Sequence, residues 1–345
     1  MPIAPFSLES YTYYLPKELI AQHPIEPRDQ ARLLVVERKC GTVREGRVSD
    51  LPDILSPGDA LVFNNTKVLH AMLKGHLESG RGVECLLTES ESPYSWWALT
   101  KPSKLFSEGR SISFAEGIEA VVIKARERGE RLLRFSQEIT PSLLQKIGTI
   151  PLPPYIRRAV DKEVDSKRYQ TVYAEHFGSV AAPTAGLHFT DRLLSSLDRK
   201  GIERHQVTLH VGTGTFVPIR TDDIRDHQMH TEQFEVDDKA ACALNQVSPS
   251  RRKVAVGTTS CRVLESIVQK NRRIEPQSGR TNLYITPGYE FTFVDTLFTN
   301  FHTPGSSLLV LVSAFMGYDL MKEAYAKAIE KRFRFFSYGD AMVIL

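Results

Sequence analysis

The sequence predicts an α/β protein in which a small antiparallel β-barrel is inserted into a larger α/β domain. Short β-rich runs separated by turns fill the region from about residue 72 to residue 135, whereas strands and helices alternate after about residue 155. With 345 residues, 41% of them hydrophobic, the chain is also long enough for two cores. We therefore expect a discontinuous α/β domain from residues 1–70 and 155–345, and an inserted barrel from residues 71–154.

Five β-rich runs predict the barrel strands. Each contains β-branched or aromatic residues, and turn-forming residues separate the runs. The runs are 83–88, 95–100, 111–114, 119–124 and 131–135. A short helix is expected next, with Thr140 as its N-cap, Pro141 at the first helical position and Gly148 after its end. The proline-rich stretch 150–155 predicts an extended boundary between the domains.

Alternating elements after this boundary predict the α/β domain. A helix capped by Thr190 is expected to end at Gly201, and the strand 206–211 follows it. A second strand, 254–256, leads into a helix whose apolar positions are 263, 264 and 267. The apolar run 308–315 is compatible with a strand or a helix, because it shows no decisive periodicity. Positions 320, 324, 328 and 329 fit one helical face, with Asp319 as the expected cap.

Charge and cysteine content argue against several classes of protein. The 44 basic and 41 acidic side chains leave a formal net charge of +3, so any contact with RNA must use local patches. The four cysteines, at 40, 85, 242 and 261, form no Cys-x-x-Cys pair, which disfavours a disulfide framework or a zinc ribbon. The sequence has neither a signal peptide nor an apolar run that could span a bilayer. We therefore expect a cytoplasmic protein without a membrane partner.

The stretch 257–260, Gly-Thr-Thr-Ser, is a candidate anion site. It follows a predicted strand and opens a helix, where backbone N–H groups and the hydroxyls of Thr258, Thr259 and Ser260 can hold a phosphate or a carboxylate. A plain N-cap explains the motif equally well. Arg262 and Glu265 follow inside the helix; an arginine there can clamp a carboxylate with two bonds, although an exposed ion pair is the commoner use.

Two histidines stand at element boundaries beside glycines. His188 precedes the Thr190 helix in the stretch 183–190, where small residues allow close backbone approach. His210 precedes Gly212 and Gly214, but this turn lacks the third glycine of a dinucleotide fingerprint, which we reject. Glycine turns of this kind are more often structural. A histidine at a strand end is nevertheless a candidate for acid–base chemistry.

Two loop-prone stretches, 284–291 and 299–304, combine aromatic and polar residues. Their aromatic side chains either belong to the core or form a face that holds a sulfonium by cation–π attraction and stacks a base. His227, His230 and Glu232 are clustered, but we expect no metal site without a cysteine pair or a His-Glu-x-x-His helix. No nucleophile elbow, P-loop or catalytic cysteine signature occurs, which argues against hydrolases and kinases.

Individually weak motifs form a specific series along the chain. The stretches are 19–24, 27–33, 169–173, 179–190, 210–216, 257–260, 264–266, 287–289, 299–302, 311–315 and 334–342. This series resembles the S-adenosylmethionine:tRNA ribosyltransferase-isomerase family of queuosine synthesis nearly from end to end. The resemblance also implies an α/β domain that carries an inserted β-barrel. Five positions depart from the usual family pattern, namely Asn65, Lys67, Arg280, Asn282 and Gly305.

The resemblance implies a reaction between S-adenosylmethionine and a tRNA whose GUN-type anticodon carries 7-aminomethyl-7-deazaguanine at the wobble position. The ribosyl moiety is transferred and isomerised, which gives epoxyqueuosine-tRNA, adenine and methionine without a further cofactor. In the chemistry proposed for the family, the sulfonium acidifies the ribosyl 5′ carbon, a base removes its proton and adenine leaves. The tRNA amine then attacks the anomeric carbon, and epoxide closure expels methionine. We expect the protein to be a monomer.

Such a route needs an acid or base, a carboxylate clamp and aromatic walls. The predicted catalytic residues are His188, His210 and His302. The predicted substrate-binding residues are Thr184, Gly186, Gly212, Gly214, Phe216, Thr258, Thr259, Ser260, Arg262, Tyr289, Asn300 and Phe301. Two rival interpretations are an S-adenosylmethionine-dependent tRNA methyltransferase, which would release S-adenosylhomocysteine, and a non-catalytic tRNA-binding protein whose barrel holds RNA.

Overall fold

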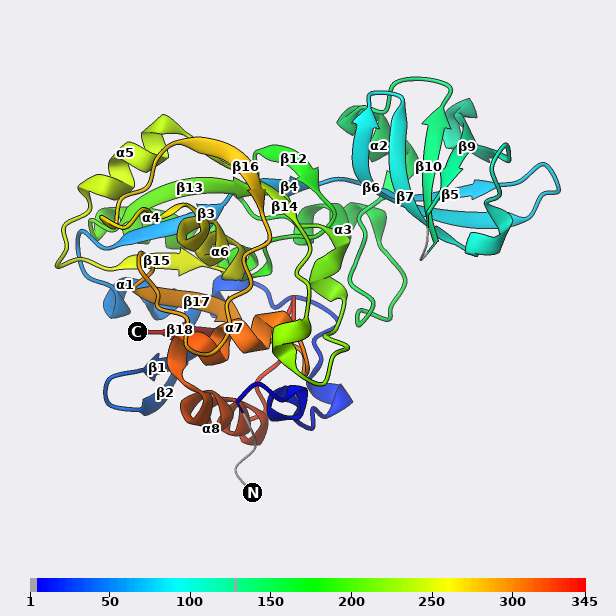
Figure 1. Cartoon of the computed structure of the whole chain (residues 1–345). Helices are drawn as coiled ribbons and strands as arrows, with labels where there is room; N and C mark the ends of the chain where they lie inside the picture. The colour runs from blue at the N-terminus through cyan, green and yellow to red at the C-terminus, as the bar shows by residue number, and fades with distance from the viewer. Residues whose placement is uncertain (1–4, 127–128) are drawn as a thin grey trace.

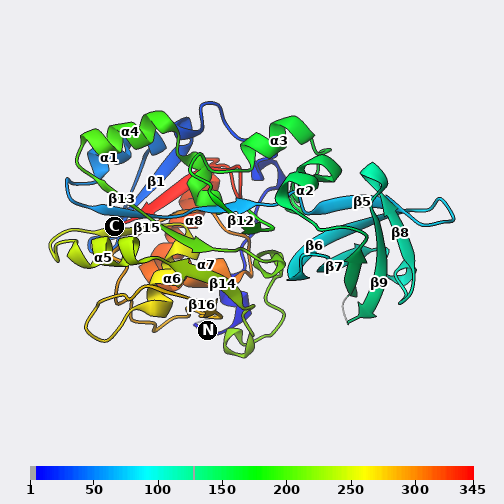
Figure 2. The same cartoon turned by 90° about the horizontal axis from the view of Figure 1, so that it is seen from above.

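The protein consists of a large α/β part and a smaller β-barrel that lies to one side of it (Figures 1 and 2). The computed structural model describes residues 5–126 and 129–345, and Phe216 without its side chain. The expected fold class, α/β with an inserted antiparallel barrel, is confirmed. The domain boundaries at residues 71 and 154 stay a prediction.

A nine-stranded mixed sheet forms the centre of the large part. Its strands are β1 (Arg32–Glu37), β2 (Thr42–Arg47), β3 (Ala60–Asn64), β13 (Glu203–Leu209), β14 (Glu232–Val236), β15 (Lys253–Val256), β16 (Gln277–Thr281), β17 (Thr296–Asn300) and β18 (Ala341–Ile344). They lie in the order β16-β14-β13-β3-β15-β17-β18-β1-β2. The four strands β13, β3, β15 and β17 run parallel to one another. Their carboxyl ends therefore meet at one edge of the sheet.

Helices cover both faces of this sheet. The helices are α1 (Leu51–Ile54), α4 (Asp191–Arg199), α5 (Asp238–Gln246), α6 (Thr258–Ile267), α7 (Ser307–Met316) and α8 (Tyr318–Glu330). Side chains of α1 and α4 share one core with Leu33 and Val35 of β1, whereas those of α5 to α8 share another core with Leu34 and Val36. Strand β1 is thus buried on both faces, and this explains why its sequence is a continuous apolar run.

The barrel is closed by antiparallel pairing throughout. Its elements are β5 (Met72–His76), β6 (Gly82–Ser92), β7 (Ser95–Lys101), β8 (Ser111–Phe114), β9 (Glu119–Ala125), β10 (Glu130–Phe135), α2 (Pro141–Ile147) and β11 (Gly148–Thr149). The order is β5-β6-β7-β10-β9-β8, and pairing of β5 with β8 closes the ring. At this seam a Cβ on Gly75 would lie 2.9 Å from the side chains of Ile112 and Phe114, so only glycine allows the close approach.

A short junction connects the two parts. It contains the parallel pair β4 (Thr66–Val68) and β12 (His176–Ser179), together with α3 (Lys162–Arg168). Lys162 Nζ donates to the carbonyl of Lys146 at the end of α2, at 2.6 Å. The remaining short turns are 3-10 helices: η1 (Leu8–Tyr11), η2 (Lys17–Leu19), η3 (Arg28–Gln30), η4 (Val48–Asp50), η5 (Ser103–Leu105), η6 (Ala115–Gly117), η8 (Thr184–His188), η9 (Thr213–Phe216) and η10 (Ile224–Asp226).

Local sequence signals located most elements. Thr140 and Thr190 cap α2 and α4 as expected, by accepting the N–H groups of Leu143 and Leu193. The undecided run 308–315 is a helix, α7. The five predicted barrel runs coincide with β6 to β10, whereas β5 and β11 were not among them.

Two predicted boundaries were wrong. The strand expected at 206–211 is β13, which ends at Leu209, because the N–H of Val211 turns away to donate to Ser179 Oγ at 2.7 Å. Asp319 does not cap α8, because Gly317 is the N-cap and Asp319 lies in the first turn. Within the described ranges, no helix is long and apolar enough to cross a membrane, and the four cysteines are free thiols.

Candidate active site

A cavity opens at the carboxyl ends of the parallel strands β13, β15 and β17, with a volume of about 110 Å³. Val211 after β13, Thr258 after β15 and His302 after β17 all line it. Ligands of open α/β sheets bind at this edge. Since a cavity of about 150 Å³ holds a benzene ring, this one accommodates one end of a nucleoside-sized molecule rather than all of it.

The first turn of α6 forms one wall of the cavity. Gly257, Thr258 and Thr259 line the space. Gly257 is the N-cap, with a φ of +91°, and no side chain caps the helix. Ser260 points elsewhere, because its Oγ donates to the carbonyl of Val256 at 3.0 Å. The hydroxyls of this stretch therefore do not cap the helix, and its partly positive start is available to an anionic group.

Thr259 and Asn300 both line the cavity, and each has a buried side-chain oxygen without a hydrogen-bond partner in the described structure. Thr259 Oγ1 is buried and has no hydrogen-bond partner in the described structure. The Asn300 side chain is 2% exposed, and its Nδ2 donates to the Phe336 carbonyl at 3.1 Å and to His188 Nε2 at 3.0 Å. Its Oδ1 is left without a partner. Unsatisfied buried oxygens are costly, so a polar ligand in the cavity would explain both of them.

His302 is the predicted histidine that lines the cavity. Its ring Nε2 lies 2.8 Å from Thr299 Oγ1, and its backbone N–H donates to Tyr325 Oη at 3.1 Å. The hydroxyl of Tyr13 donates to its carbonyl. Burial lowers the pKa of His302 to about 3, so the ring is neutral and keeps a lone pair at physiological pH.

His188 lies behind Asn300 rather than in the cavity wall. It ends η8, where its Nε2 accepts the Asn300 amide. Burial, followed by the charges of Arg334 and Arg28, lowers its pKa to about 3. Because Nε2 is an acceptor, the proton of this neutral ring sits on Nδ1. His188 therefore orients Asn300, and the two predicted residues form one hydrogen-bonded unit.

His210 lies outside the cavity wall, beside the junction. Its Nδ1 is 2.8 Å from Thr66 Oγ1, which is 2.7 Å from Ser179 Oγ. Ser179 Oγ also accepts the Val211 N–H at 2.7 Å. These contacts connect the His210 ring to the backbone that follows β13. The pKa of His210 is lowered, mainly by burial and then by His176.

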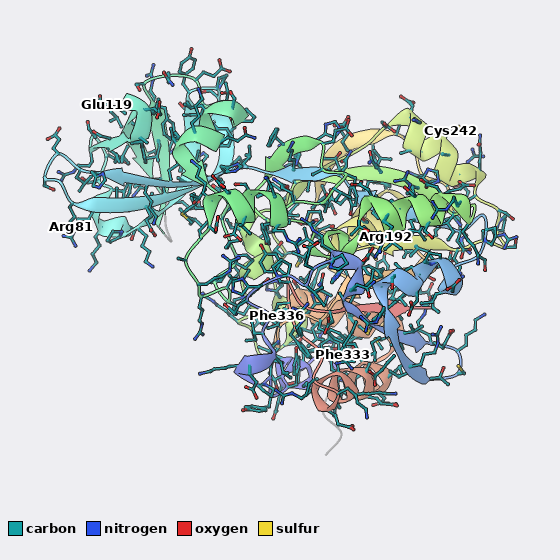
Figure 3. All side chains as sticks on the ribbon, turned by 180° about the vertical axis from the view of Figure 1, so that it is seen from behind. Arg81, Glu119, Arg192, Cys242, Phe333 and Phe336 are labelled. Carbon is teal, nitrogen blue, oxygen red and sulfur yellow. The ribbon has the colours of Figure 1, made fainter. Side chains whose placement is uncertain are left out.

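The cavity lining is neutral, hydroxylated and partly aromatic. Among the described residues that line it, none is Asp, Glu, Lys or Arg. The rings of Tyr155 and Phe336 lie 4.7 Å apart, and Tyr155 Oη is 2.5 Å from Ser337 Oγ. Phe336 belongs to the large part, while Arg81 and Glu119 mark the barrel (Figure 3). A lining of this kind can hold a cation, because it offers aromatic rings and contains no lysine or arginine that would repel a positive charge.

Several predicted binding residues do not line the cavity. They include Gly186, Gly212, Gly214, Ser260, Arg262 and Tyr289, whereas Thr184, Thr258, Thr259, Asn300 and Phe301 do line it. Gly186 is packed so closely that a Cβ would lie 1.9 Å from Tyr173 Oη. The Tyr289 hydroxyl donates to Glu265 Oε2 at 3.1 Å, and Glu265 also holds the backbone of the 292–294 loop. The side chain of Phe216 lies outside the described residues.

The cluster of His227, His230 and Glu232 is dispersed among other partners. The ring of His227 stacks edge-on against Tyr284 at 5.4 Å, and Glu232 pairs with Arg262. Over residues 5–126 and 129–345, no group of three or more His, Cys, Asp or Glu is arranged to hold a metal ion.

Comparison with known proteins establishes the family of the chain. The sequence profile of the family described as "Queuosine biosynthesis protein" matches residues 8–344. The chain belongs to this family. An S-adenosylmethionine:tRNA ribosyltransferase-isomerase of Symbiobacterium thermophilum is 46% identical over 342 residues, which cover 98% of this chain and 99% of that protein. The crystal structure of an S-adenosylmethionine tRNA ribosyltransferase from Thermotoga maritima matches with a TM-score of 0.56 and 35% identity, over 97% of this chain and all of that one.

As a member of the queuosine biosynthesis family, the chain is a transferase. Three of the five positions that depart from the usual family pattern have side-chain partners, namely Asn65, Lys67 and Arg280. Thr208 donates to Asn65 Oδ1 at 2.7 Å, and Lys67 Nζ lies 4.7 Å from the Phe177 ring centre. Arg280 pairs with Glu89 of the barrel at 3.0 Å. Gly305 adopts a φ of +67°, which a lysine would strain.

Sequence reasoning missed several wall residues, namely Tyr155, Thr215, Thr303, Phe336 and Ser337. Phe336 and Ser337 lie in the stretch 334–342 that resembles the family, so that resemblance could have marked them. Tyr155 was visible only as the end of the proline-rich boundary. No local pattern indicates that this boundary reaches the cavity.

Proposed function

We propose that the protein transfers and isomerises the ribosyl moiety of S-adenosylmethionine onto 7-aminomethyl-7-deazaguanine at the wobble position of tRNA. The products would be epoxyqueuosine-tRNA, adenine and methionine. The observation that carries the proposal is the neutral, hydroxylated cavity at the carboxyl ends of β13, β15 and β17 in a member of the queuosine biosynthesis family. The GUN-type anticodon, the monomeric state, the cytoplasmic location and the absence of a further cofactor stay predictions.

The amino-acid end of S-adenosylmethionine fits the unpaired groups of the cavity wall. Its carboxylate would bind the uncapped start of α6 and the Thr259 hydroxyl. Its ammonium would donate to Asn300 Oδ1, which otherwise lacks a partner. A bound methionyl group would thus satisfy two buried oxygens at once, and the ribosyl and adenine groups would extend from the small cavity toward its mouth.

The sulfonium fits the aromatic part of the lining. Tyr155 and Phe336 offer ring faces, and the wall contains no basic side chain that would repel the cation. Burial raises the pKa of Tyr155 to about 12, so its hydroxyl stays protonated and the wall stays neutral. The positive charge on sulfur is then unscreened by counter-ions, which favours loss of a proton from the neighbouring 5′ carbon.

His302 is the proposed proton carrier of the reaction. Burial keeps the ring neutral, so its lone pair can accept the 5′ proton. The lowered pKa makes it a weak base, so the sulfonium beside the 5′ carbon must supply the acidity that the transfer needs. The resulting imidazolium is a strong acid, so it would pass this proton on to the departing adenine. The tRNA amine then attacks the anomeric carbon and loses a proton, and closure of the epoxide breaks the carbon–sulfur bond and releases methionine. His188, behind Asn300, and His210, outside the wall, would position other groups.

The direct test combines purified protein, S-adenosylmethionine and tRNA that carries 7-aminomethyl-7-deazaguanine, with mass spectrometry of the products. Equal amounts of adenine, methionine and epoxyqueuosine are expected, whereas tRNA with guanine at the same position should give none. S-adenosylhomocysteine would instead establish a methyltransferase. Binding of tRNA without turnover would indicate a non-catalytic protein.

The His302→Gln variant tests the role of the proton carrier. We expect kcat to fall by about 100-fold or more, because a positioned acid–base group contributes that much. Exchange of the 5′ hydrogen with deuterated water should fall with it. A variant that keeps normal exchange would remove His302 from the reaction and leave the overall function to be judged by its products.

A further inference from the structure

The turn that follows β13 reaches the cavity and is held in place by two residues that do not line it, Glu232 and His230. It comprises residues 212–216 and contributes Thr215 to the cavity wall. Its backbone N–H at Gly212 donates to Glu232 Oε1 at 3.0 Å. A Cβ on Gly214 would lie 2.1 Å from His230, so the turn lies against that ring with no space between. Glu232 and His230 therefore determine where Thr215 sits.

Glu232 is itself held by Arg262 of α6. The two side chains form an ion pair, and each is 5% exposed. Arg262 Nε also donates to the carbonyl of Leu283 at 3.0 Å. Arg262 lies one turn further along α6 than Thr258 and Thr259, which also line the cavity. One buried chain of bonds thus links the helix start to the glycine turn.

A gain in stability does not by itself explain why Glu232 and Arg262 form a buried ion pair. Taking two charges out of water costs free energy that their attraction often only balances, and apolar replacements of buried pairs are frequently as stable. The geometry here is also incomplete, because the buried Arg262 Nη2 has no partner in the described structure. The pair holds Glu232 Oε1 in place as the acceptor of the Gly212 N–H. Apolar side chains at these two positions would leave that N–H without a partner.

We propose that Glu232 and Arg262 are positioning residues for substrate binding, which hold the 212–216 turn and the α6 start at a fixed separation across the cavity. Neither side chain lines the cavity, so both act on the bound molecule through the residues of the wall. Arg262 acts through Glu232 rather than as a direct carboxylate clamp. The proposal rests on the cavity as the S-adenosylmethionine site, but it concerns the geometry of the wall and not the reaction.

The experiment compares Glu232→Gln with the wild type by steady-state kinetics and by hydrogen exchange of the 212–216 amides. Losing the charge should release the turn, because Arg262 is left uncompensated and the Gly212 acceptor is weakened. We expect KM for S-adenosylmethionine to rise about tenfold with a much smaller change in kcat, since a remote misplacement acts through geometry. Exchange of the Gly212 amide should become faster by a similar factor.

The chain offers a matched control in the ion pair between Arg252 and Asp59, where Asp59 is 2% exposed and the atoms are 2.7 Å apart. Neither residue lines the cavity. Asp59→Asn should lower the melting temperature without changing KM or exchange at Gly212. A rise of KM in Asp59→Asn equal to that in Glu232→Gln would overturn the proposal, since general loosening would then account for both.

A second variant covers the case in which Glu232→Gln does not fold. Gly214→Ala leaves the ion pair intact but forces the turn away from His230. It should reproduce the rise of KM with little loss of kcat. If KM is unchanged in a folded Gly214→Ala protein, the position of the turn does not matter and the proposal fails. Product analysis of the wild type is independent of either result, so failure here is distinct from failure of the proposed function.

Discussion

At the level of single residues, Thr259 and Thr296 allow the effect of a buried hydroxyl on ligand binding to be distinguished from its effect on stability. Thr259 Oγ1 and Thr296 Oγ1 are both buried without partners, but only Thr259 lines the cavity. Replacing a buried unsatisfied hydroxyl by a methyl group of similar shape removes a desolvation cost. The proposed site would therefore explain the unpaired hydroxyl of Thr259, whereas nothing in the structure explains that of Thr296.

Thr259→Val should accordingly raise stability and weaken binding together. We expect the free energy of unfolding to increase by about 1 kcal/mol, while the dissociation constant for S-adenosylmethionine rises about tenfold because one hydrogen bond to a charged group is lost. Thr296→Val should show the gain in stability alone. Urea denaturation and calorimetric titration measure both quantities, and unchanged affinity in Thr259→Val would exclude its hydroxyl from the site.

The buried histidines predict how stability depends on pH. The pKa of His302 is lowered from its ordinary value of 6.5 to about 3 by burial, so the unfolded chain binds more protons than the folded one between these values. Stability is therefore fully present above about pH 6.5 and is lost as the pH falls toward 3. The slope is about 1.4 kcal/mol per pH unit for each such histidine.

His302→Gln should flatten this dependence. Between pH 6 and pH 5 the wild type should lose about 1 kcal/mol more than the variant, as measured by urea denaturation at both values. His76→Gln provides the control, because His76 is an exposed residue of β5. Equal slopes in His302→Gln and the wild type would mean that the folded protein protonates this ring.

At the level of elements, the helix N-caps Thr140 and Thr190 have the same side chain but bond to different partners. Thr140 Oγ1 accepts the N–H of Leu143, with Ser142 as its other neighbour. Thr190 Oγ1 accepts the N–H of Leu193 and also donates to Asp29 Oδ2 at 2.6 Å. Asp29 is 1% exposed, so its carboxylate depends on such donors.

Thr190→Ala should therefore destabilise the protein more than Thr140→Ala. The simple cap is worth about 1 kcal/mol, whereas loss of the bond to a buried carboxylate adds about 1.5–3 kcal/mol at Thr190. Urea denaturation compares the two variants. Equal losses would indicate that Arg192, which bonds the other oxygen of Asp29 at 2.8 Å, suffices to stabilise this carboxylate.

Sequence patterns located elements where the signal is local and failed where it is tertiary. Thr140, Pro141 and Thr190 mark helix starts through bonds within four residues. The end of β13 depends instead on Ser179, a distant residue. Helix α7 is buried on nearly every side, so its sequence has no polar face from which a helical period could be recognised.

The same distinction applies to the candidate site. Thr258, Thr259 and His302 follow strands, and their polar character at those positions predicted them. Tyr155 and Phe336 reach the same cavity from the junction and from the end of the chain, by a path that no spacing encodes. Arg262 has the right chemistry for a clamp, but only the structure reveals Glu232 as its partner.

At the level of the whole molecule, the junction is the candidate surface for tRNA. Residues 155–168 carry five basic and three acidic side chains, and Arg158 and Asp165 pair with each other. Tyr155 starts this segment in the cavity wall, and Lys162 connects it to the barrel side. A tRNA that delivers its base to the cavity would bring phosphates close to the exposed Arg157 and Lys167.

Arg157→Gln and Lys167→Gln should each reduce the salt dependence of tRNA binding. The slope of log K against log salt concentration is expected to fall by about 1 for each phosphate contact removed. Lys39→Gln is the matched control, because Lys39 is exposed in the β1–β2 turn. A slope that changes equally in all three variants would mean that tRNA responds only to net charge.

The large sheet joins the most distant parts of the chain. β18 lies between β17 and β1, and Asp340 beside it bonds the N–H of Arg32 across 308 positions of sequence. The barrel, by contrast, is built from consecutive hairpins such as β6–β7. Contacts between near neighbours form faster than those that close long loops. During refolding the barrel is therefore expected to appear early, while the large sheet, and with it the cavity, is completed last and limits the rate at which active protein is recovered.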